Sequence, residues 1–497
     1  MDQDFMGKLL SMLGLCFVLI MVALDQTVIG TALPTIASDL NGFDLYAWVA
    51  TAYLLTSVIA LPIFGKLGDE HGRKPFVVVA IILFTLASML CGASFSMLQL
   101  VVSRALQGIA GGMLITTSFA SVPDLFPEPR ERLRWQVLFS TAFGIANAVG
   151  PSLGGYLTRY WGWRYVFFVN LPVGLLSLYF TWRHLPKIRH KENPPSPLDW
   201  QGAVLVAAFL SSLQLLVEWL PAHKPFFELA LLGAIGIISL FMLIRWESRC
   251  DNPILPLSMF SHRSLAPLFA LSLLMGFCMF AVMYYSPLLF QGGFGLAADE
   301  AGLLVTPLAV SITIGSIING RIVTRMEKPN KMLYIGISLF LASALFLIQV
   351  KASTPHGIVA SIMTTGGLGL GLMMPNITLF VQACASRMEL GVATALLQST
   401  RMIGGMLGTA IVGVLVSNRY SGNVDKSLAD PQILVNRDLE AKFELLHRNA
   451  SLLVAKARLT LVDAVHHSLW LVVLLLALSL LGAMFVPPIS LHRREHD

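Results

Sequence analysis

Long apolar stretches follow one another along almost the whole chain, separated by short polar segments. Each is long enough, at about 20 residues, to cross the ~30 Å hydrocarbon core of a bilayer as a helix. The first follows an acidic start, MDQDF, and is longer than the core of a signal peptide, so we expect it to be retained. The pattern predicts about fourteen membrane-spanning helices, over 9–34, 46–64, 76–96, 98–122, 135–158, 163–182, 200–220, 226–244, 264–290, 301–323, 332–350, 356–381, 391–417 and 467–487.

Composition agrees with this pattern and excludes a soluble globular enzyme. Of the 497 residues, 56% are apolar and only 12% are charged. Soluble domains carry about 25% charged residues, because a surface that faces water has to be covered. The five cysteines are scattered without a CxxC pair, so we expect packing residues and no metal site or disulfide framework. The predicted fold class is an all-α integral membrane protein.

The net charge of +6 is explained by membrane orientation and not by a nucleic-acid partner. If both termini are cytoplasmic, the short outer loops hold only Arg159, Arg164, Lys224 and Lys351. Cationic residues of short loops mark the cytoplasmic side of a bilayer. The inner loops then hold Lys66, Arg73, Lys74, Arg130, Arg132, Arg134, Arg183, Lys187, Arg189, Lys191, Arg245, Arg249, Arg263, Arg321, Arg325, Lys328 and Lys331.

Weak internal similarity divides the chain into two halves. GIAGGM at 108–113 resembles GLGLGL at 367–372, which is in register if the seventh and eighth spans are an insertion. Repeated six-helix halves are typical of secondary transporters. We expect a six-helix bundle over 1–183, a cytoplasmic linker over 184–199, two inserted helices over 200–245 and a second six-helix bundle over 264–487. A helical period within the polar outer segment 418–466 predicts one or two surface helices.

Asp25 is the clearest acidic residue inside a predicted span. It lies roughly sixteen residues, or about 24 Å, into the first apolar stretch. A carboxylate at that depth is costly, and such residues usually mark an ion or substrate path. We expect Asp25 to be a reversible proton carrier, with a structural carboxylate paired to a neighbouring helix as the alternative.

Arg104 is the second charge inside a predicted span. It lies in the fourth stretch about 9 Å below the outer face, at a depth similar to that of Asp25. The two side chains are therefore predicted to meet in the outer half of the bundle. Arginine does not give up its own proton, so its expected role is to tune a nearby carboxylate and to couple that charge to helix position. A purely structural pair is the alternative.

Two glycine-rich segments add candidate gating residues. GKLGDEHGRKPF at 65–76 joins the second and third spans, and its charges suit either contacts made in only one transport state or a simple positive-inside anchor. GGMLG at 404–408, preceded by Arg401, has a counterpart in the fifth span that combines a helix-bending proline with small residues suited to close packing. That counterpart contains Gly144, Gly150, Pro151, Gly154 and Gly155.

These segments together resemble those of the major facilitator superfamily. The resemblance to its fourteen-helix group of drug:proton antiporters, the EmrB/QacA type, covers nearly the whole chain. LDQTVIGTALPTI resembles the first-helix motif of that group, RALQGIAGGM the fourth-helix motif and GIANAVGPSLGG the antiporter motif of the fifth helix. GKLGDEHGRKPF is similar to the loop motif between helices two and three, and WGWRYVFFVNLPVG at 161–174 to a segment typical of the group.

The resemblance implies a role for each matching residue. Asp25 and Arg104 would take part in proton coupling, and Gly150 and Pro151 would shape the fifth helix and limit proton leak. A cytoplasmic conformational gate that holds the outward-facing state would consist of Gly65, Asp69, Gly72, Arg73, Lys74 and Asp124.

The implied activity is proton-coupled multidrug efflux, in which two six-helix bundles export lipophilic or cationic compounds by alternating access. A dedicated exporter of an endogenous metabolite, such as a siderophore or an antibiotic, is the alternative. We expect a bacterial inner-membrane location with both termini cytoplasmic and no cofactor. Some relatives also work with a periplasmic membrane-fusion partner.

One departure from the group concerns the substrate. Multidrug relatives often carry extra acidic residues deep in the later helices, and here the ninth to fourteenth spans show none near mid-membrane. This puts dicationic substrates in doubt and allows a narrower or neutral substrate. The candidate pocket residues, each with ordinary packing as the alternative, are Trp48, Tyr53, Gln107 and Arg401.

Other classes of membrane protein lack their signatures in this sequence. A membrane-embedded enzyme would need clustered ligands such as HExxH, and a primary pump would need GxxxxGK[ST]; neither occurs. The segment that resembles the antiporter motif argues against a passive channel. We therefore expect a transporter and not an enzyme.

Overall fold

A computed structural model of the chain shows helices joined by short turns, and no strand, among the residues that it describes. These are residues 3–126, 129–186, 199–219, 225–250, 253, 257–323, 326, 328–385, 390–424, 432–435, 440 and 450–487. Most of the predicted linker, 184–199, lies outside them.

The first group of helices in the chain runs from α1 to α7. It comprises α1 (Gln3–Asp39), α2 (Tyr46–His71), α3 (Arg73–Gly92), α4 (Met97–Leu125), α5 (Pro129–Tyr160), the short α6 (Tyr165–Phe168) and α7 (Asn170–His184). The pair α8 (Trp200–Trp219) and α9 (Phe226–Glu247) follows, packed together and touching α2 and α15.

The last group comprises α10 (Leu257–Ser261), α11 (Ala266–Leu288), α12 (Ala298–Ile322), α13 (Asn330–Leu347), α14 (His356–Cys384), α15 (Leu390–Asn423), α16 (Gln432–Val435) and α18 (Ala450–Gly482). A π-helical turn, η2 (Leu289–Gly293), continues α11, and short 3-10 turns lie at Phe43–Leu45 (η1) and Ala483–Phe485 (η5).

The predicted fold class is confirmed. Thirteen helices among the described residues are long and apolar enough to cross a membrane, and they coincide with thirteen of the predicted spans. The remaining span, predicted over 135–158, forms the 32-residue helix α5.

The last helix differs from the prediction. It begins at Ala450 and continues to Gly482, whereas the apolar pattern predicts a start at 467. Residues 450–466 therefore extend the last span and do not form a separate surface helix. The physical reason is that neither glycine nor proline interrupts this stretch, so the charged side chains on its exposed face do not end the helix.

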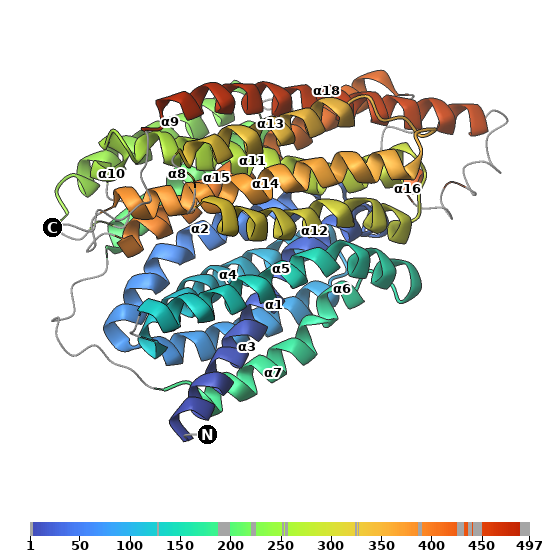
Figure 1. The fold of residues 1–497 in the computed structure, drawn as a ribbon. Coiled ribbons are helices and arrows are strands. Elements are labelled where there is room, and N and C mark those ends of the chain that lie inside the picture. The colour runs from blue at the N-terminus through green and yellow to red at the C-terminus, as the bar shows by residue number, and fades with distance from the viewer. Residues whose placement is uncertain are drawn as a thin grey trace.

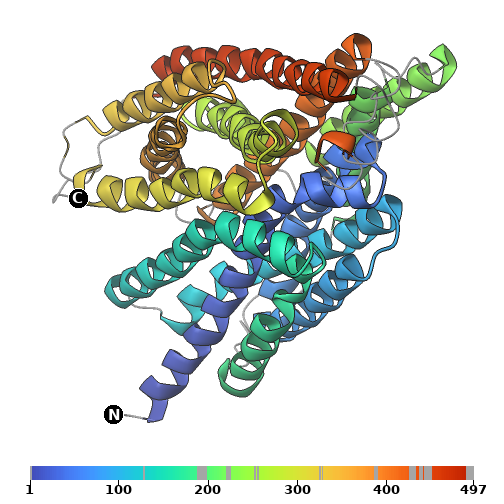
Figure 2. The same ribbon diagram turned by 90° about the vertical axis from the view of Figure 1, so that its right-hand side faces the viewer.

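The two groups of helices lie side by side, α1–α7 below and α11–α18 above in Figure 1, and Figure 2 shows the same division after a quarter turn. The start of α1 and the end of α18 lie at one end of the molecule, called here the near end. The opposite end, which holds the α3–α4 turn at 93–96 and the start of α12, is the far end.

Helix α5 lies between the two groups and packs closely on both through its glycines. A Cβ at Gly154 would overlap the backbone of Val28 in α1, and one at Gly155 would overlap the backbone of Ala298 in α12. Small residues allow this approach of helix backbones where the bilayer offers no hydrophobic drive. The glycines of α5 at these contacts are therefore a packing requirement.

Hydrogen bonds between the two groups lie at the middle and the far end of the molecule. The Thr51 and Thr409 hydroxyls are 3.0 Å apart, and Tyr46 donates to the Tyr284 carbonyl at 2.9 Å. Arg159 at the end of α5 forms an ion pair with Asp299 at the start of α12, at 2.6 Å. Among the described residues, these contacts close the far end.

Substitution of Gly154 by alanine is expected to destabilise the protein. Alanine normally stabilises a helix by about 1 kcal/mol relative to glycine. At this position, however, its methyl group would overlap the backbone of Val28. Thermal unfolding in detergent should show a lower melting temperature for Gly154→Ala. The matched control is Gly233→Ala in α9, where nothing lies within 4 Å of the added Cβ and no loss is expected. Equal melting temperatures for the two variants would contradict the packing argument.

Candidate functional site

Asp25 and Arg104 form a fully buried ion pair inside the first group of helices. The Arg104 Nη1 donates to Asp25 Oδ2 at 2.6 Å, and both side chains are 0% exposed. Asp25 comes from α1 and Arg104 from α4, so the pair joins two helices. The meeting that their similar depths predict is present in the structure.

Two amide side chains complete the surroundings of the carboxylate. Gln107 Nε2, one turn after Arg104 in α4, donates to Asp25 Oδ1 at 2.7 Å. Asn170 Nδ2, at the start of α7, donates to the same oxygen at 3.3 Å and to Ser88 Oγ in α3 at 3.0 Å. Gln107 also accepts from Arg104 Nη1 at 2.7 Å. We call Asp25, Arg104, Gln107, Asn170 and Tyr53 the polar cluster.

The guanidinium of Arg104 is held from α2 as well. Its Nε donates to the Val49 carbonyl at 3.2 Å, and its Cζ lies 4.4 Å from the centre of the Tyr53 ring, in a cation–π arrangement. Its Nη2 is buried without a hydrogen-bond partner among the described residues. The two N–H groups of this nitrogen are therefore left for a further acceptor.

This arrangement links the charge of Asp25 to the packing of five helices. The carboxyl group of Asp25 accepts three hydrogen bonds, and a bound proton would turn one of its acceptor positions into a donor. Protonation would leave Arg104 as an uncompensated buried cation, and breaking a buried pair in this way costs about 3–5 kcal/mol. A proton can thus be bound at Asp25 only together with movement or rehydration of Arg104.

The loop between α2 and α3 makes a charge contact at the near end. Gly72 has φ +88°, a conformation that favours glycine, so α3 can begin directly after α2 ends. Arg73 Nε lies 2.9 Å from Asp124 Oδ2 at the end of α4. Lys74 follows on the same turn, and the side chain of Asp69 lies outside the described residues.

The four predicted pocket residues do not lie together: two belong to the polar cluster and two are half-buried on other helix faces. Tyr53 and Gln107 belong to the polar cluster and are buried, whereas Trp48 is half-buried in α2. Arg401 is half-buried in α15 and donates to Gln398 Oε1. Gly65 lies against Thr116 of α4, where an added Cβ would be 2.9 Å from the Thr116 methyl group.

Comparison with known proteins identifies the family. The family model of the Major Facilitator Superfamily matches residues 15–409. The multidrug transporter protein MdtP of Bacillus subtilis is 35% identical over 414 residues, 83% of this chain and 75% of the relative. Multidrug resistance protein 3 of the same organism is 30% identical over 423 residues, covering 84% and 81%. The chain belongs to the major facilitator superfamily.

Solved structures of the superfamily agree on the fold. A bacterial homologue of the human lysosomal transporter Spinster, in an inward-facing and unoccupied conformation, superposes with a TM-score of 0.68 at 15% identity, covering 97% of this chain and 99% of that one. At this identity the likeness concerns the fold alone. The protein is therefore a multi-pass membrane transporter of the superfamily.

Asn170 and Ser88 are members of the site region that sequence reasoning missed. Asn170 lies in WGWRYVFFVNLPVG, the segment typical of the fourteen-helix group, and it is 0% exposed. The sequence signal that could have identified Asn170 is a polar amide side chain within an otherwise apolar stretch. Among the described residues no three His, Cys, Asp or Glu side chains lie together as metal ligands.

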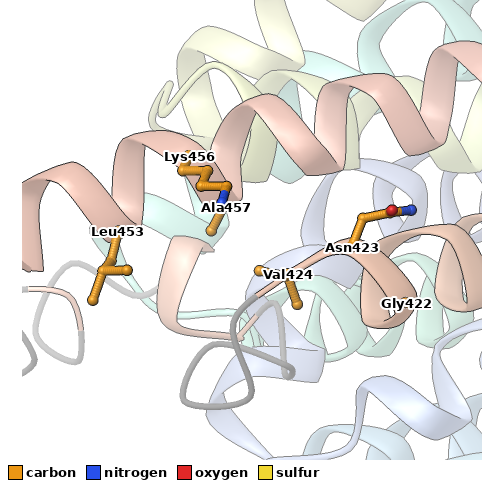
Figure 3. A pocket seen from close by; sticks show the side chains of 6 residues that line it. All are labelled: Gly422, Asn423, Val424, Leu453, Lys456 and Ala457. Atoms are coloured by element: carbon orange, nitrogen blue, oxygen red, sulfur yellow. The ribbon is translucent and has the colours of Figure 1, made fainter.

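A cavity of about 400 Å³ lies at the far end, between the end of α15 and the start of α18 (Figure 3). Lys456 is the charged side chain of its lining, and the polar cluster contributes no residue to it. This cavity is therefore separate from the site of the buried charges. Its lining consists of Gly422, Asn423, Val424, Leu453, Lys456 and Ala457.

A buried glutamine joins the two groups of helices at the far end. Gln291, in the π-helical turn after α11, donates from Nε2 to the Thr31 carbonyl at 2.7 Å and accepts from Thr35 Oγ1 at 3.0 Å. Arg458 of α18 holds the same turn through the Gly292 carbonyl at 2.9 Å. Single π-helical turns recur at functional positions. We call Gln291, Thr31 and Thr35 the far-end latch.

Substitution of Gln291 by leucine is expected to open the far end. Leucine fills a similar volume but makes neither bond to α1. In a background without the five native cysteines, maleimide labelling of Ser152→Cys, which lies between α5 and α12, should become severalfold faster in Gln291→Leu. The matched control is Gln349→Leu, because that exposed amide bonds only to its own helix. An unchanged labelling rate would show that the latch does not hold the far end closed.

Proposed function

We propose that the protein is a proton-coupled multidrug efflux transporter that exports lipophilic compounds by alternating access of its two six-helix bundles. The observation that carries this proposal is the fully buried ion pair of Asp25 and Arg104 inside a membrane transporter. An ionisable pair that is costly to bury is expected to serve an ion path. The names of the two Bacillus subtilis relatives support multidrug export as the task.

The contacts of the described residues suit one step of such a cycle. The far end is held closed by the latch and by the Arg159–Asp299 pair, and Asp25 has no contact with solvent. A proton that enters at Asp25 would release Arg104, and the freed cation would favour a different packing of α1 against α4. Inward movement of one proton supplies roughly 2.3 kcal/mol per 100 mV of membrane potential. That energy drives the return of the empty transporter.

The orientation follows from the charge distribution. We place the near end in the cytoplasm, because the basic residues of the short loops gather there. This puts both termini in the cytoplasm of a bacterial inner membrane and the latch on the outer side. The near-end pair Arg73–Asp124 then belongs to the cytoplasmic gate. A periplasmic membrane-fusion partner stays a prediction from the resemblance.

Substitution of Asp25 by asparagine is expected to abolish export driven by a pH gradient. Asparagine has nearly the same shape but binds no proton, so substrate movement is no longer linked to proton movement. In proteoliposomes, the rate of pH-driven tetraphenylphosphonium transport should be at least tenfold lower for Asp25→Asn than for the wild type. It should retain exchange of the compound between equal pools, which needs no proton. Normal pH-driven transport at matched protein content would refute the coupling role.

The double variant Asp25→Asn with Arg104→Gln separates coupling from folding. Each single change leaves a charged or hydrogen-bonded partner unmatched in a dry interior, which is strongly destabilising. The double change removes both charges, so its melting temperature should lie above that of either single variant. Its pH-driven transport should nevertheless stay absent. Recovery of pH-driven transport in the double variant would show that the pair is merely structural.

A further inference from the structure

Arg401 is the second arginine in the interior of the helix bundle. It lies on α15 about 17 Å along the helix from Leu390, well within the span from Val392 to Asn423. Its neighbours in sequence, Thr400 and Met402, are buried, while Arg401 itself is half-buried. Burying a guanidinium at this depth costs free energy, as it does for Arg104. The surroundings of the two arginines can therefore be compared.

The partners of Arg401 are all electrically neutral. Nη2 donates to Gln398 Oε1 of the same helix, and Nη1 contacts Met374 Sδ of α14 at 3.6 Å. Among the described residues, no carboxylate lies within 4.0 Å of its guanidinium. Its Nε makes no hydrogen bond among the described residues, and the side chain as a whole is half-buried. Arg401 therefore differs from Arg104, whose charge is neutralised by Asp25.

The backbone around Arg401 is fixed in place. A Cβ on Gly276 of α11 would overlap the Arg401 carbonyl oxygen, and a Cβ on Gly404 would overlap the Leu273 carbonyl oxygen. These two glycine contacts hold α15 directly against α11. The side chain therefore projects from a rigid helix toward α14. Met374 forms part of this surface, and methionine adapts its shape to apolar groups of different form.

We propose that Arg401, positioned by Gln398, binds the anionic group of the transported compound, so that the protein exports lipophilic carboxylates or sulfonates. Planar guanidinium groups pair with carboxylates through two parallel hydrogen bonds, and Arg401 has free donors for this purpose. Met374 borders the apolar part of the same compound. This inference rests on the proposed export function and names its substrate class. It also accounts for the lack of acidic residues near mid-membrane in the later spans.

The test compares two fluorescent probes that differ only in charge. The first is 8-(dansylamino)octanoate and the second is its primary amide, both titrated by fluorescence against the purified full-length protein in detergent. The wild-type protein should bind the carboxylate about tenfold or more tightly than the amide, the gain expected of a charge-assisted pair. Arg401→Gln should remove that preference and leave the affinity for the amide within twofold. Arg401→Lys should keep part of it.

The matched control is Arg419→Gln, on the same helix, whose guanidinium is paired with Asp463 and exposed. It should bind both probes like the wild type. Equal affinities of the wild type for the two probes would overturn the proposal. An equal loss of both probes in Arg401→Gln would overturn it as well, since a structural role would act on both. So would an unchanged carboxylate affinity together with loss of pH-driven transport, because Arg401 would then serve coupling.

The two proposals, proton-coupled export and the anion site at Arg401, can fail independently, and binding and transport measurements distinguish the two failures. If the wild type moved no compound under a pH gradient but kept its preference for the carboxylate, the anion site would stand and the coupled export would fall. If transport of tetraphenylphosphonium were coupled to protons while the carboxylate preference was absent, export would stand and the anion site would fall. Binding and transport thus report on the two proposals separately.

Discussion

The packing of the first group of helices depends on the need to match the two charges that are buried inside it. A lone carboxylate or guanidinium in a dry interior costs several kcal/mol, so Asp25 and Arg104 are stable only together. The requirement extends to Gln107 and Asn170, which occupy the remaining acceptor positions of the carboxylate. Five helices, α1, α2, α3, α4 and α7, contribute residues to this one network. The packing of the first bundle is therefore arranged around a single ionisable group.

The charged residues of the site could be predicted from the sequence, whereas most of its neutral polar residues could not. Asp25 and Arg104 stand out because charged residues are rare in apolar stretches, and helix geometry placed both at one depth. Asn170 and Ser88 gave a weaker signal, since polar neutral residues in membrane helices commonly bond to their own backbone. Gln291 was missed because its π-helical turn follows a different backbone hydrogen-bonding pattern, which apolar periodicity does not encode. The early start of α18 was missed because charged residues on an exposed helix face look like a surface segment.

The two bundles treat their interior arginines differently, and this asymmetry separates two tasks. In the first bundle Arg104 is fully enclosed and neutralised, so its charge acts only when Asp25 changes. In the second group of helices the guanidinium of Arg401 meets only neutral groups among the described residues, which is the basis for proposing it as an anion site. The proposed proton site at Asp25 and the proposed anion site at Arg401 therefore lie in different groups of helices.

Helix α1 connects the ionisable group to the far end by its own rigidity. Asp25 lies about 9 Å along the helix from Thr31, whose carbonyl accepts from Gln291, and Thr31 also donates to the Pro151 carbonyl of α5. Between them, Thr27 and Val28 lie against Gly150 and Gly154, so α1 and α5 cannot slide independently. Helix α1 therefore carries both the contact to Arg104 and the contacts to the latch. Under the proposed coupling, a change of charge at Asp25 and a change of packing at the far end would act on the same helix.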